Sequence, residues 1–332
     1  MDKMTEQILR RRMHGLYLSR KCEDITQLSH KLLGLHCWFH RNVAFSALIR
    51  GASLSGWKTA LTKTWLYRGT LHGVVFDDLP LLLALHSDDS FSWLLGQKQL
   101  KDIAGKVVSL MEDGVYSRAE MRRIFAFDLD EQTIDRIFSP WGGIFVCLAR
   151  LGKVAFRDMT SRDFDLIDAE PTQTPDEVLP ELLRKFFAAY GPATLADAAW
   201  FLGLWKDSKK KLSALNLDEF SRLEYDGNVY YYVENESDMG DIPELTLLSG
   251  FDPLIVSYAE RSSILPPEYK NAVILKSGIC LPTIAINGRV AGLWNIKKRE
   301  VTVEFFVEQP KRIKNATSDL LENIRWQTAG IV

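Results

Sequence analysis

The feature that most constrains the fold is a local order that occurs three times, short helical segments followed by a β-hairpin. The first round predicts helices over residues 4–14, 24–35 and 42–49, a helical stretch over 55–64 and a strand over 68–76. Helical periodicity supports these limits, with Asp24 as an N-cap and Gly51 as a helix end.

The same order returns twice further along the chain. The second round predicts helices over residues 118–125, 130–138 and 141–151 and a strand over 153–156. The third predicts helices over residues 180–190, 195–201 and 206–215, then a hairpin over 223–232 that turns at Asp226-Gly227. Helices followed by a two-stranded hairpin are the order of a winged helix, a helix-turn-helix with a β-wing.

From residue 245 the pattern becomes β. Apolar runs predict strands over residues 245–248, 272–275, 283–286, 289–295 and 301–307, with a hairpin turn at Asn287-Gly288 and a final helix over 317–326. We therefore expect an α+β chain of three tandem winged-helix units followed by a small C-terminal β-barrel or sheet domain. The expected limits are residues 1–95 for the first, basic unit, 96–172 for the second, 173–242 for the third and 243–332 for the β-rich domain.

Bulk composition indicates a soluble globular chain. No run of about eighteen apolar residues predicts a membrane span, and the charged N-terminus lacks a signal-peptide core. The four cysteines lack Cys-x-x-Cys spacing and predict separate reduced thiols, so we expect a cytoplasmic protein. Neither a metal-ligand cluster nor a Gly-rich phosphate loop is present, so no metal and no cofactor are expected.

Charge is distributed unevenly along the chain. Residues 1–76 contain twelve Lys and Arg against four Asp and Glu, a charge of +8, whereas the remainder carries −10. A basic region of this size is typical of a surface that binds a polyanion. The alternative is a basic face that docks on an acidic neighbour.

A basic, aromatic junction follows the helical stretch of the first round. Residues 64–72 combine Trp65 and Tyr67 with Arg68, a glycine turn and a histidine, and Lys58 and Lys63 add positive charge. Such residues can hold phosphates and stack on bases. The alternative is a half-buried strand, and Trp65 fits the core better than a stacking platform.

Five segments in a fixed order carry a family resemblance. They are Gly34-Leu35-His36-Cys37-Trp38 through Arg50, the stretch 64–72, Tyr190-Gly191-Pro192-Ala193-Thr194, Gly250-Phe251-Asp252-Pro253 with Arg261, and Asn287-Gly288-Arg289-Val290-Ala291-Gly292-Leu293-Trp294. Together they resemble the winged-helix DNA-binding family that contains the AlkZ and YcaQ DNA glycosylases. The resemblance covers nearly the whole chain and implies three tandem winged helices, a C-terminal β-domain and a concave, basic DNA-binding surface.

The resemblance also implies an activity and site residues. Characterised members remove bulky N7-alkylguanine or N3-alkyladenine adducts and unhook interstrand crosslinks. The residues expected to contact DNA are Trp38, His40, Arg41, Lys58, Lys63, Arg68, Thr70 and His72. Gly69 matches the family and is expected to serve a backbone turn. Asp252 and Arg261 also match, and we favour an ion pair between them that braces the β-domain against the wings.

The chain departs from the family at the catalytic segment. The glycosylases have a glutamine, a hydrophobic residue and then a glutamine or aspartate, where this chain has His36, Cys37 and Trp38. Indole only donates hydrogen bonds, so Trp38 cannot accept one from an attacking water. His36 can accept through a neutral ring nitrogen and is the expected catalytic residue. The alternative is that His36 is a polar residue at a helix end.

Two functions follow from these observations. The first is a monofunctional glycosylase that hydrolyses the N-glycosidic bond of bulky N7- or N3-alkylated purines in double-stranded DNA, with crosslink unhooking as a further possibility. The second is a winged-helix DNA-binding or regulatory protein without hydrolytic activity. We expect a monomer in either case.

Overall fold

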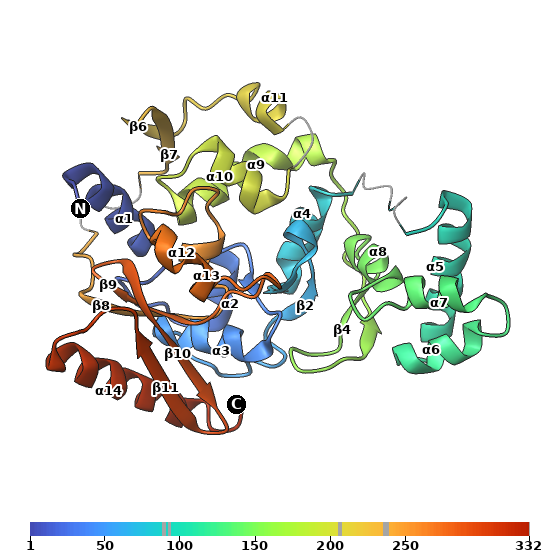
Figure 1. The fold of residues 1–332 in the computed structure, drawn as a ribbon. Coiled ribbons are helices and arrows are strands. Elements are labelled where there is room, and N and C mark those ends of the chain that lie inside the picture. Colours follow the sequence, from blue (N-terminus) through green and yellow to red (C-terminus); the bar gives the residue numbers. More distant parts are fainter. Residues whose placement is uncertain (88–90, 92–93, 205–207, 235–238, 332) are drawn as a thin grey trace. The chain divides into compact units, whose positions relative to one another are not determined.

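The computed structural model of the protein describes residues 1–87, 91, 94–204, 208–234 and 239–331 (Figure 1). The chain forms two compact units. The first combines residues 1–55 with residues 183–332, and the second consists of residues 56–182. The four domains expected from the sequence are successive segments of the chain rather than compact units, and this division stays a prediction.

Three helices open the first unit, and side chains cap the first two of them. They are α1 Lys3–Gly15, α2 Ile25–Lys31 and α3 His40–Ile49. The short strand β1 Leu35–His36 lies between α2 and α3. The Asp2 carboxylate accepts from the backbone N–H groups of Met4 and Thr5, and the Asp24 carboxylate accepts from that of Gln27. These side chains satisfy N–H groups that a helix start leaves open, so both helices begin where the sequence predicted.

The first unit resumes at Leu183, within α9 Pro175–Tyr190, the helix that carries the chain out of the second unit. Its next elements are α10 Leu195–Leu202, α11 Ser208–Ser213, β6 Ser221–Tyr225 and β7 Asn228–Tyr232. Thr194 and Asp197 form a reciprocal capping box at the start of α10. Asp226 and Gly227 both have positive φ, 50° and 70°, as a two-residue hairpin turn requires, so the predicted turn is confirmed. Residues 206 and 207 of the predicted helix 206–215 lie outside the described residues.

The C-terminal part of the first unit is an open antiparallel sheet. Its strands β8 Leu245–Leu248, β9 Thr283–Ile286, β10 Arg289–Lys297 and β11 Glu300–Phe305 lie in the order β11-β10-β9-β8. Helix α14 Lys311–Gln327 contributes Leu321 and Ile324 to a core that also contains Phe45 and Trp294. Of the two expected forms, barrel or sheet, the structure therefore shows the sheet.

Short helical turns connect the first two strands of this sheet. They are α12 Pro253–Val256, the 3-10 turn Pro267–Tyr269 and α13 Lys270–Val273. The strand predicted over residues 272–275 is therefore wrong. Pro266 and Pro267 hold φ near −65° and lead the chain into a helical turn, which the apolar run by itself did not indicate.

The second unit contains four strands, β2 to β5, and the helices α4 to α8. Its strands are β2 Thr62–Trp65, β3 Leu71–Val74, β4 Val154–Phe156 and β5 Phe164–Leu166, in the order β3-β2-β4-β5. Its helices are α4 Leu79–Ala84, α5 Gln97–Glu112, α6 Arg118–Phe125, α7 Glu131–Ile137 and α8 Ile144–Arg150, with 3-10 turns at Tyr67–Gly69 and Phe76–Asp78. The N-caps predicted for α6 and α7 are confirmed, because Ser117 and Asp130 accept from Glu120 and Thr133.

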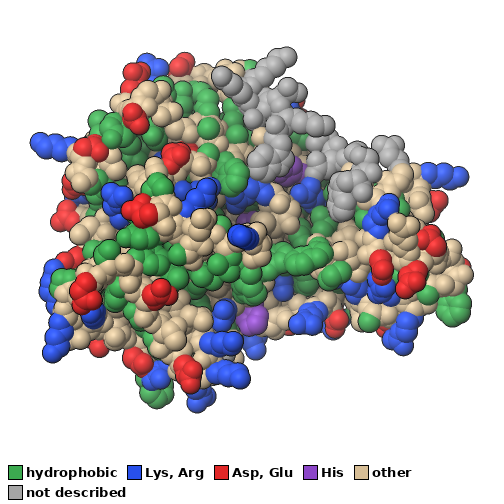
Figure 2. Space-filling view, viewed as in Figure 1, with side chains coloured by type: hydrophobic (Ala, Val, Ile, Leu, Met, Phe, Trp, Pro, Cys, Tyr) green, Lys and Arg blue, Asp and Glu red, His purple; other side chains and the backbone are tan. Residues whose placement is uncertain are grey.

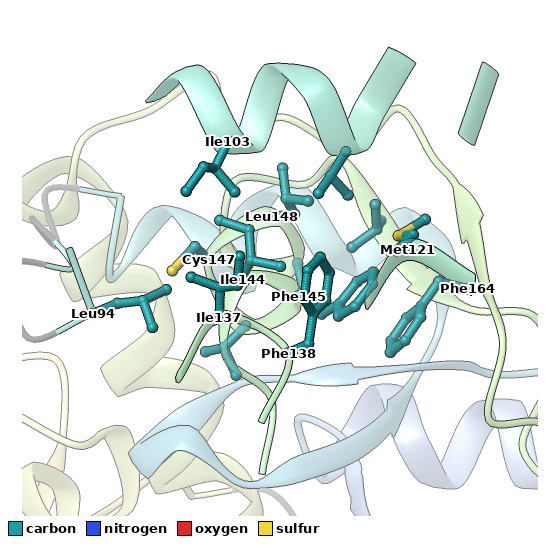
Figure 3. Packing of buried hydrophobic residues seen from close by; sticks show 14 of the residues in the cluster. Leu94, Ile103, Met121, Ile137, Phe138, Ile144, Phe145, Cys147, Leu148 and Phe164 are labelled. Atoms are coloured by element: carbon teal, nitrogen blue, oxygen red, sulfur yellow. The ribbon is translucent and has the colours of Figure 1, made fainter. Parts of the chain in front are cut away.

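One apolar cluster holds the second unit together. The rings of Phe145 and Phe164 stack at 4.0 Å, and Phe138 and Ile144 pack beside them (Figure 3). Trp65 belongs to the same cluster and is only 3% exposed, which confirms its predicted place in the core. Burial of aromatic and aliphatic surface is the main stabilising contribution here.

In this unit one helix prediction was wrong, one helix begins later than predicted, and two helices, α4 and α5, were missed. Residues 55–64 form turns and then β2, because Gly56 is left-handed and the β-branched Thr62 and Thr64 suit a strand. Helix α8 begins at Ile144, three residues later than predicted, since a Cβ on Gly143 would lie 2.1 Å from the Ile137 carbonyl oxygen. No helix was predicted where α4 and α5 lie.

The expectation of a mixed α and β chain with antiparallel strands is confirmed. All four cysteines are buried free thiols, as their spacing predicted. Among the described residues, no helix is both long and apolar enough to cross a membrane.

Candidate active site and nucleic-acid interface

A tight turn after α2 positions His36. Leu33 and Gly34 both have positive φ, 57° and 103°, and the Gly34 N–H donates to the Ser29 carbonyl at 2.8 Å. This turn ends the helix and directs the chain into β1, whose second residue is His36. The His36 side chain is half-buried.

Phe251 holds the His36 ring by stacking. The two ring centroids lie 4.0 Å apart and the ring planes differ by 5°. Phe251 has a φ of 57°, and a Cβ on the preceding Gly250 would lie 2.8 Å from the Asn42 amide nitrogen. The loop around Gly250 therefore packs closely against α3 and presents Phe251 to the imidazole. Phe251 lies within one of the five family segments, but no local pattern in the sequence indicates that it stacks on His36.

The backbone beside His36 bears on its tautomer. The Trp38 N–H points at His36 Nδ1 over 3.5 Å, the outer limit of a hydrogen bond. In this arrangement Nδ1 accepts and Nε2 carries the hydrogen. A bond this long contributes less than the ~1 kcal/mol of a typical one.

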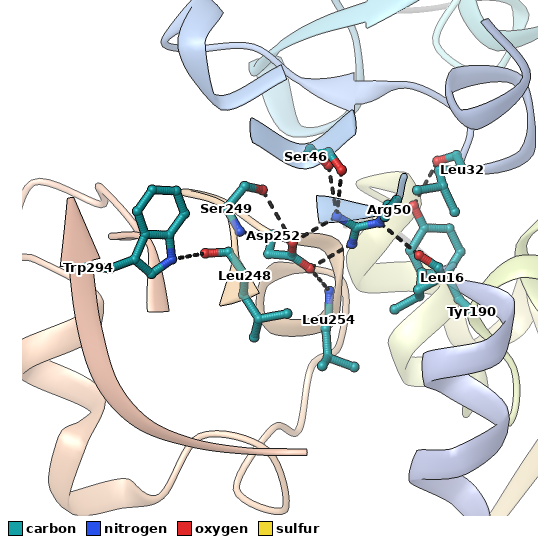
Figure 4. Close-up of polar contacts among 10 residues, drawn as sticks. All are labelled: Leu16, Leu32, Ser46, Arg50, Tyr190, Leu248, Ser249, Asp252, Leu254 and Trp294. Carbon is teal, nitrogen blue, oxygen red and sulfur yellow. Dashed lines mark hydrogen bonds and ion pairs between the residues drawn. The ribbon is translucent and has the colours of Figure 1, made fainter. Parts of the chain in front are cut away.

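A buried ion pair fixes the loop that carries Phe251. Arg50 donates to both carboxylate oxygens of Asp252, at 2.9 and 3.1 Å, and both side chains are 0% exposed (Figure 4). Arg50 also donates to the Leu16 carbonyl and the Ser46 hydroxyl, and Asp252 accepts from Ser249 and Leu254. The pair is bidentate and its remaining groups are satisfied, which offsets the cost of burying two charges.

The predicted partner of Asp252 was wrong. Its carboxylate faces Arg50 at the end of α3, whereas the Arg261 guanidinium lies 5.5 Å from the ring centroid of Trp200. The predicted brace between the β-rich region and the helices therefore exists, but Arg50 supplies the cation. Asp252 also caps α12, where its carboxylate accepts from the Leu254 N–H.

His40 and Arg41 lie at the start of α3 in the same unit. His40 Nε2 lies 3.4 Å from the Ile331 carbonyl oxygen, and Arg41 reaches the Ile296 carbonyl at 3.4 Å. Both side chains are half-buried, as is Trp38. Burial lowers the pKa of the Arg41 guanidinium, which nevertheless stays charged at neutral pH.

The second unit holds the other predicted DNA contacts. Arg68 and Gly69 form the turn between β2 and β3 with φ of 54° and 68°, so the backbone role expected for Gly69 is confirmed. The Thr70 hydroxyl donates to the Tyr67 carbonyl at 3.0 Å and helps to close this turn. Arg68 and Thr70 are half-buried, and Lys58 is exposed.

Two residues of this group are withdrawn from the surface. The Lys63 ammonium donates to the carbonyls of Met159 and Ser161 at 3.4 and 3.3 Å, and only 9% of the residue is exposed. His72 is 5% exposed, and burial lowers its pKa to about 4. Its ring is neutral at physiological pH and therefore adds no charge to the surface.

The predicted site residues thus form two sets, one in each unit. The set in the first unit is His36, Trp38, His40, Arg41, Asp252 and Arg261. The set in the second unit is Lys58, Lys63, Arg68, Gly69, Thr70 and His72. On the face drawn in Figure 2, basic and acidic side chains are interspersed.

Comparison with known proteins identifies the family. The model of a family described as DNA glycosylase AlkZ-like matches residues 58–324. The interstrand DNA cross-link repair glycosylase of Streptomyces sahachiroi is 27% identical over 275 residues, which are 74% of this chain and 73% of that protein. The solved structure of Streptomyces sahachiroi DNA glycosylase AlkZ is similar in fold, with a TM-score of 0.76 at 23% identity over 97% of this chain and 96% of the other. The family match spans most of the sequence, and the chain belongs to the AlkZ-like DNA glycosylase family.

Proposed function

We propose that the protein is a DNA glycosylase that hydrolyses the N-glycosidic bond of purines alkylated at N7 or N3 in double-stranded DNA. The observation that carries this proposal is the family match over residues 58–324, joined to a likeness of fold over 97% of the chain. The similar protein from Streptomyces sahachiroi is named for cross-link repair, so adducts that join two strands are included among the proposed substrates.

The order of elements supports the proposed architecture of three winged helices. Helices α1 to α3 precede the hairpin β2–β3, helices α6 to α8 precede β4–β5, and helices α9 to α11 precede β6–β7. The proposed limits are residues 1–95, 96–172 and 173–242, with residues 243–332 as the β-rich domain. Winged helices bind duplex DNA through a helix and a wing, and a DNA repair enzyme must bind a duplex.

The chemistry requires little from the protein. Alkylation at N7 leaves the purine cationic and therefore a good leaving group. What remains is to place a water and to stabilise the positive charge that develops on the sugar. We propose that His36 positions the attacking water. Its Nε2 can accept a hydrogen bond from that water once the ring hydrogen moves to Nδ1.

The contacts with the DNA backbone are assigned to the accessible members of the two sets. Arg41, Lys58 and Arg68 supply charge, and the Thr70 hydroxyl can reach a phosphate oxygen. Trp38 and His40 lie beside His36 and are proposed to contact the sugar or base. Lys63 and His72 are buried, so their proposed part is to support the β2–β3 hairpin from within.

One observation favours a second function, DNA binding without hydrolysis. Trp38 occupies the position where the family resemblance expects a second acceptor, and an indole cannot accept a hydrogen bond from water. The family match itself begins at residue 58, so it does not include residues 36–38. The chain would then recognise damaged DNA and leave excision to another protein.

An excision assay separates the two functions. The purified protein is incubated with a duplex that carries one bulky N7-alkylguanine, and abasic sites are scored by alkaline cleavage. We expect release above the spontaneous rate, at least tenfold lower in His36→Ala, because general base assistance typically contributes 10²-fold or more. His36→Gln restores an acceptor and should keep more activity than His36→Phe, which keeps only the stacking on Phe251.

Position 38 supplies the matched control. Trp38→Gln adds an acceptor, and Trp38→Phe removes the indole donor without adding one. Excision that appears only in Trp38→Gln, with wild type inactive but bound to DNA, would establish the second function. Wild-type excision that is unaffected by His36→Ala would overturn the assignment of the water to His36.

A further inference from the structure

A basic pocket lies where the ends of α1 and α2 meet α9 in the first unit. Its volume is about 450 Å³. The residues that line it are Gly15, Tyr17, Arg20, His30, Lys31, Arg184, Lys185, Ala188 and Ala189. Four of these are Lys or Arg and one is His, and none of the described lining residues is acidic. The charge is therefore concentrated, in contrast to the mixed charges elsewhere on the unit.

Backbone contacts give this pocket fixed walls. A Cβ on Gly15 would lie 2.3 Å from the Ala189 carbonyl oxygen, so α1 and α9 touch backbone to backbone. The Tyr190 hydroxyl donates to the Leu32 carbonyl at 2.7 Å and ties the end of α9 to the segment after α2. The three elements cannot move apart without losing these buried contacts, so the basic side chains converge on a preformed hollow.

Helix electrostatics explains only part of this cluster. His30 and Lys31 lie in the last turn of α2, where a cation is favourable next to the helix C-terminus. Arg184 lies in the middle of α9, three residues after Glu181, and Arg20 lies in a loop. Neither position benefits from a helix terminus. Repulsion among these cations is relieved when an anion binds between them.

Arg20 is also oriented before any ligand binds. Its Nε donates to the His14 carbonyl at 3.0 Å, and its guanidinium lies 4.3 Å from the centroid of the Tyr17 ring. Tyr17 itself follows α1 with a φ of 59°, which turns its ring toward Arg20. An arginine fixed in this way loses little conformational freedom when it donates to a phosphate.

Basic side chains continue beyond the pocket along α1. A smaller adjoining hollow shares Gly15, Arg20 and Ala188 with it and is also lined by Arg11 and His14. Arg11 is held 4.3 Å over the Tyr232 ring and 3.1 Å from Glu234. Basic side chains therefore line two adjoining hollows, and a polyanion with successive phosphates can occupy both where a compact anion can occupy only one.

We propose that this pocket binds backbone phosphates of the DNA strand next to the damaged base. The inference rests on the proposed function and adds a second contact region to it. Five residues of chain join Lys31 to His36, which limits their separation to about 18 Å. At a rise of about 3.4 Å per nucleotide, the bound phosphates lie within roughly five nucleotides of the base at His36.

The first test measures the salt dependence of DNA binding. Lys31 and Arg184 are exposed, so Lys31→Gln/Arg184→Gln should fold normally, which a thermal melt verifies. Each lost phosphate contact lowers the slope of log K against log salt by about 0.9, so the double variant should lose about two units of slope. Lys276→Gln/Lys311→Gln removes the same charge from exposed sites outside both hollows and should leave the slope unchanged.

The second test locates the phosphates. Single phosphates of the duplex are replaced one at a time by neutral methylphosphonates. We expect one or two positions within five nucleotides of the lesion where the replacement weakens wild-type binding about tenfold but leaves binding by Lys31→Gln/Arg184→Gln unchanged. Contacts made by other residues would weaken binding by both proteins equally.

The outcomes separate the pocket from the proposed function. If the wild type binds DNA but the slope of log K against log salt is unchanged in the double variant, the pocket does not bind DNA phosphates. The proposed glycosylase function would not be affected by this result. A further outcome is that inorganic phosphate binds saturably to the wild type and not to the double variant while the salt dependence of DNA binding stays unchanged. That result would show that the pocket binds a free anion, and it would contradict the proposal that it binds DNA phosphates. Failure of the wild type to bind DNA at all overturns both.

Discussion

His72 shows how burial at one residue links stability to pH. Burial lowers its folded-state pKa from an ordinary value of 6.5 to about 4. The unfolded chain therefore binds the proton more readily than the folded chain between these two values. The stabilisation is complete above pH 6.5 and is lost as the pH falls toward 4.

This gives a prediction at the residue scale. Between pH 7 and pH 5 the wild type should lose about 2 kcal/mol in free energy of unfolding through this group. His72→Gln keeps a donor for the Thr70 carbonyl and does not titrate, so its stability should vary less over the same range. Urea unfolding at the two pH values measures the difference. Equal pH dependence in the wild type and in His72→Gln would contradict the prediction.

At the scale of elements, two hairpin turns have a glycine with similar φ but different surroundings. Gly288 follows Asn287 in the β9–β10 turn with a φ of 75°, and Gly227 follows Asp226 in the β6–β7 turn with a φ of 70°. A Cβ on Gly288 would lie 2.3 Å from Cδ2 of the buried Leu9, whereas a Cβ on Gly227 meets nothing within 4 Å. The β9–β10 turn therefore also packs against α1.

Alanine at the two positions should separate backbone strain from packing. Gly227→Ala should cost about 1–2 kcal/mol, the strain of a left-handed alanine. Gly288→Ala carries the same strain and an overpacking cost of about 1–3 kcal/mol, because the buried Leu9 side chain must shift to admit the new Cβ. Thermal unfolding of both variants measures the difference, and equal losses would show that the Leu9 contact yields freely.

At the scale of the whole molecule, the two units differ in how the chain builds them. The second unit is continuous, and its core cluster lies entirely within residues 56–182. The first unit joins two distant segments, with Phe45 beside Trp294 in its core and Arg50 paired with Asp252. Removing one partner of a buried pair typically costs about 3–5 kcal/mol.

Separate expression of the segments tests this difference. Residues 56–182 should unfold cooperatively alone, whereas residues 183–332 should not fold, because Asp252 would be buried without its cation. Adding residues 1–55 in trans should restore a folded complex, seen as new dispersed amide resonances. A folded fragment 183–332 on its own would contradict the prediction, and Asp252→Asn in that fragment checks whether the carboxylate is the cause.

Features with local causes could be predicted from the amino-acid sequence. The caps at Asp24, Ser117 and Asp130 and the turn at Asp226-Gly227 lie where predicted, because each depends on hydrogen bonds or φ angles within a few residues. Helix α5 also had a local signal in the spacing of Ile103, Val107 and Met111, although it was missed. The family resemblance likewise depended on residues read in order.

The tertiary structure alone decided the partners of the site residues. Arg50 and Asp252 are 202 positions apart, and no spacing rule indicates that Arg50, rather than the nearer Arg261, neutralises the carboxylate. The stacking of His36 on Phe251 and the convergence of α1, α2 and α9 around the basic pocket are equally non-local. Such contacts depend on how elements pack, and packing is set by shape and burial over the whole unit rather than by neighbours in the sequence.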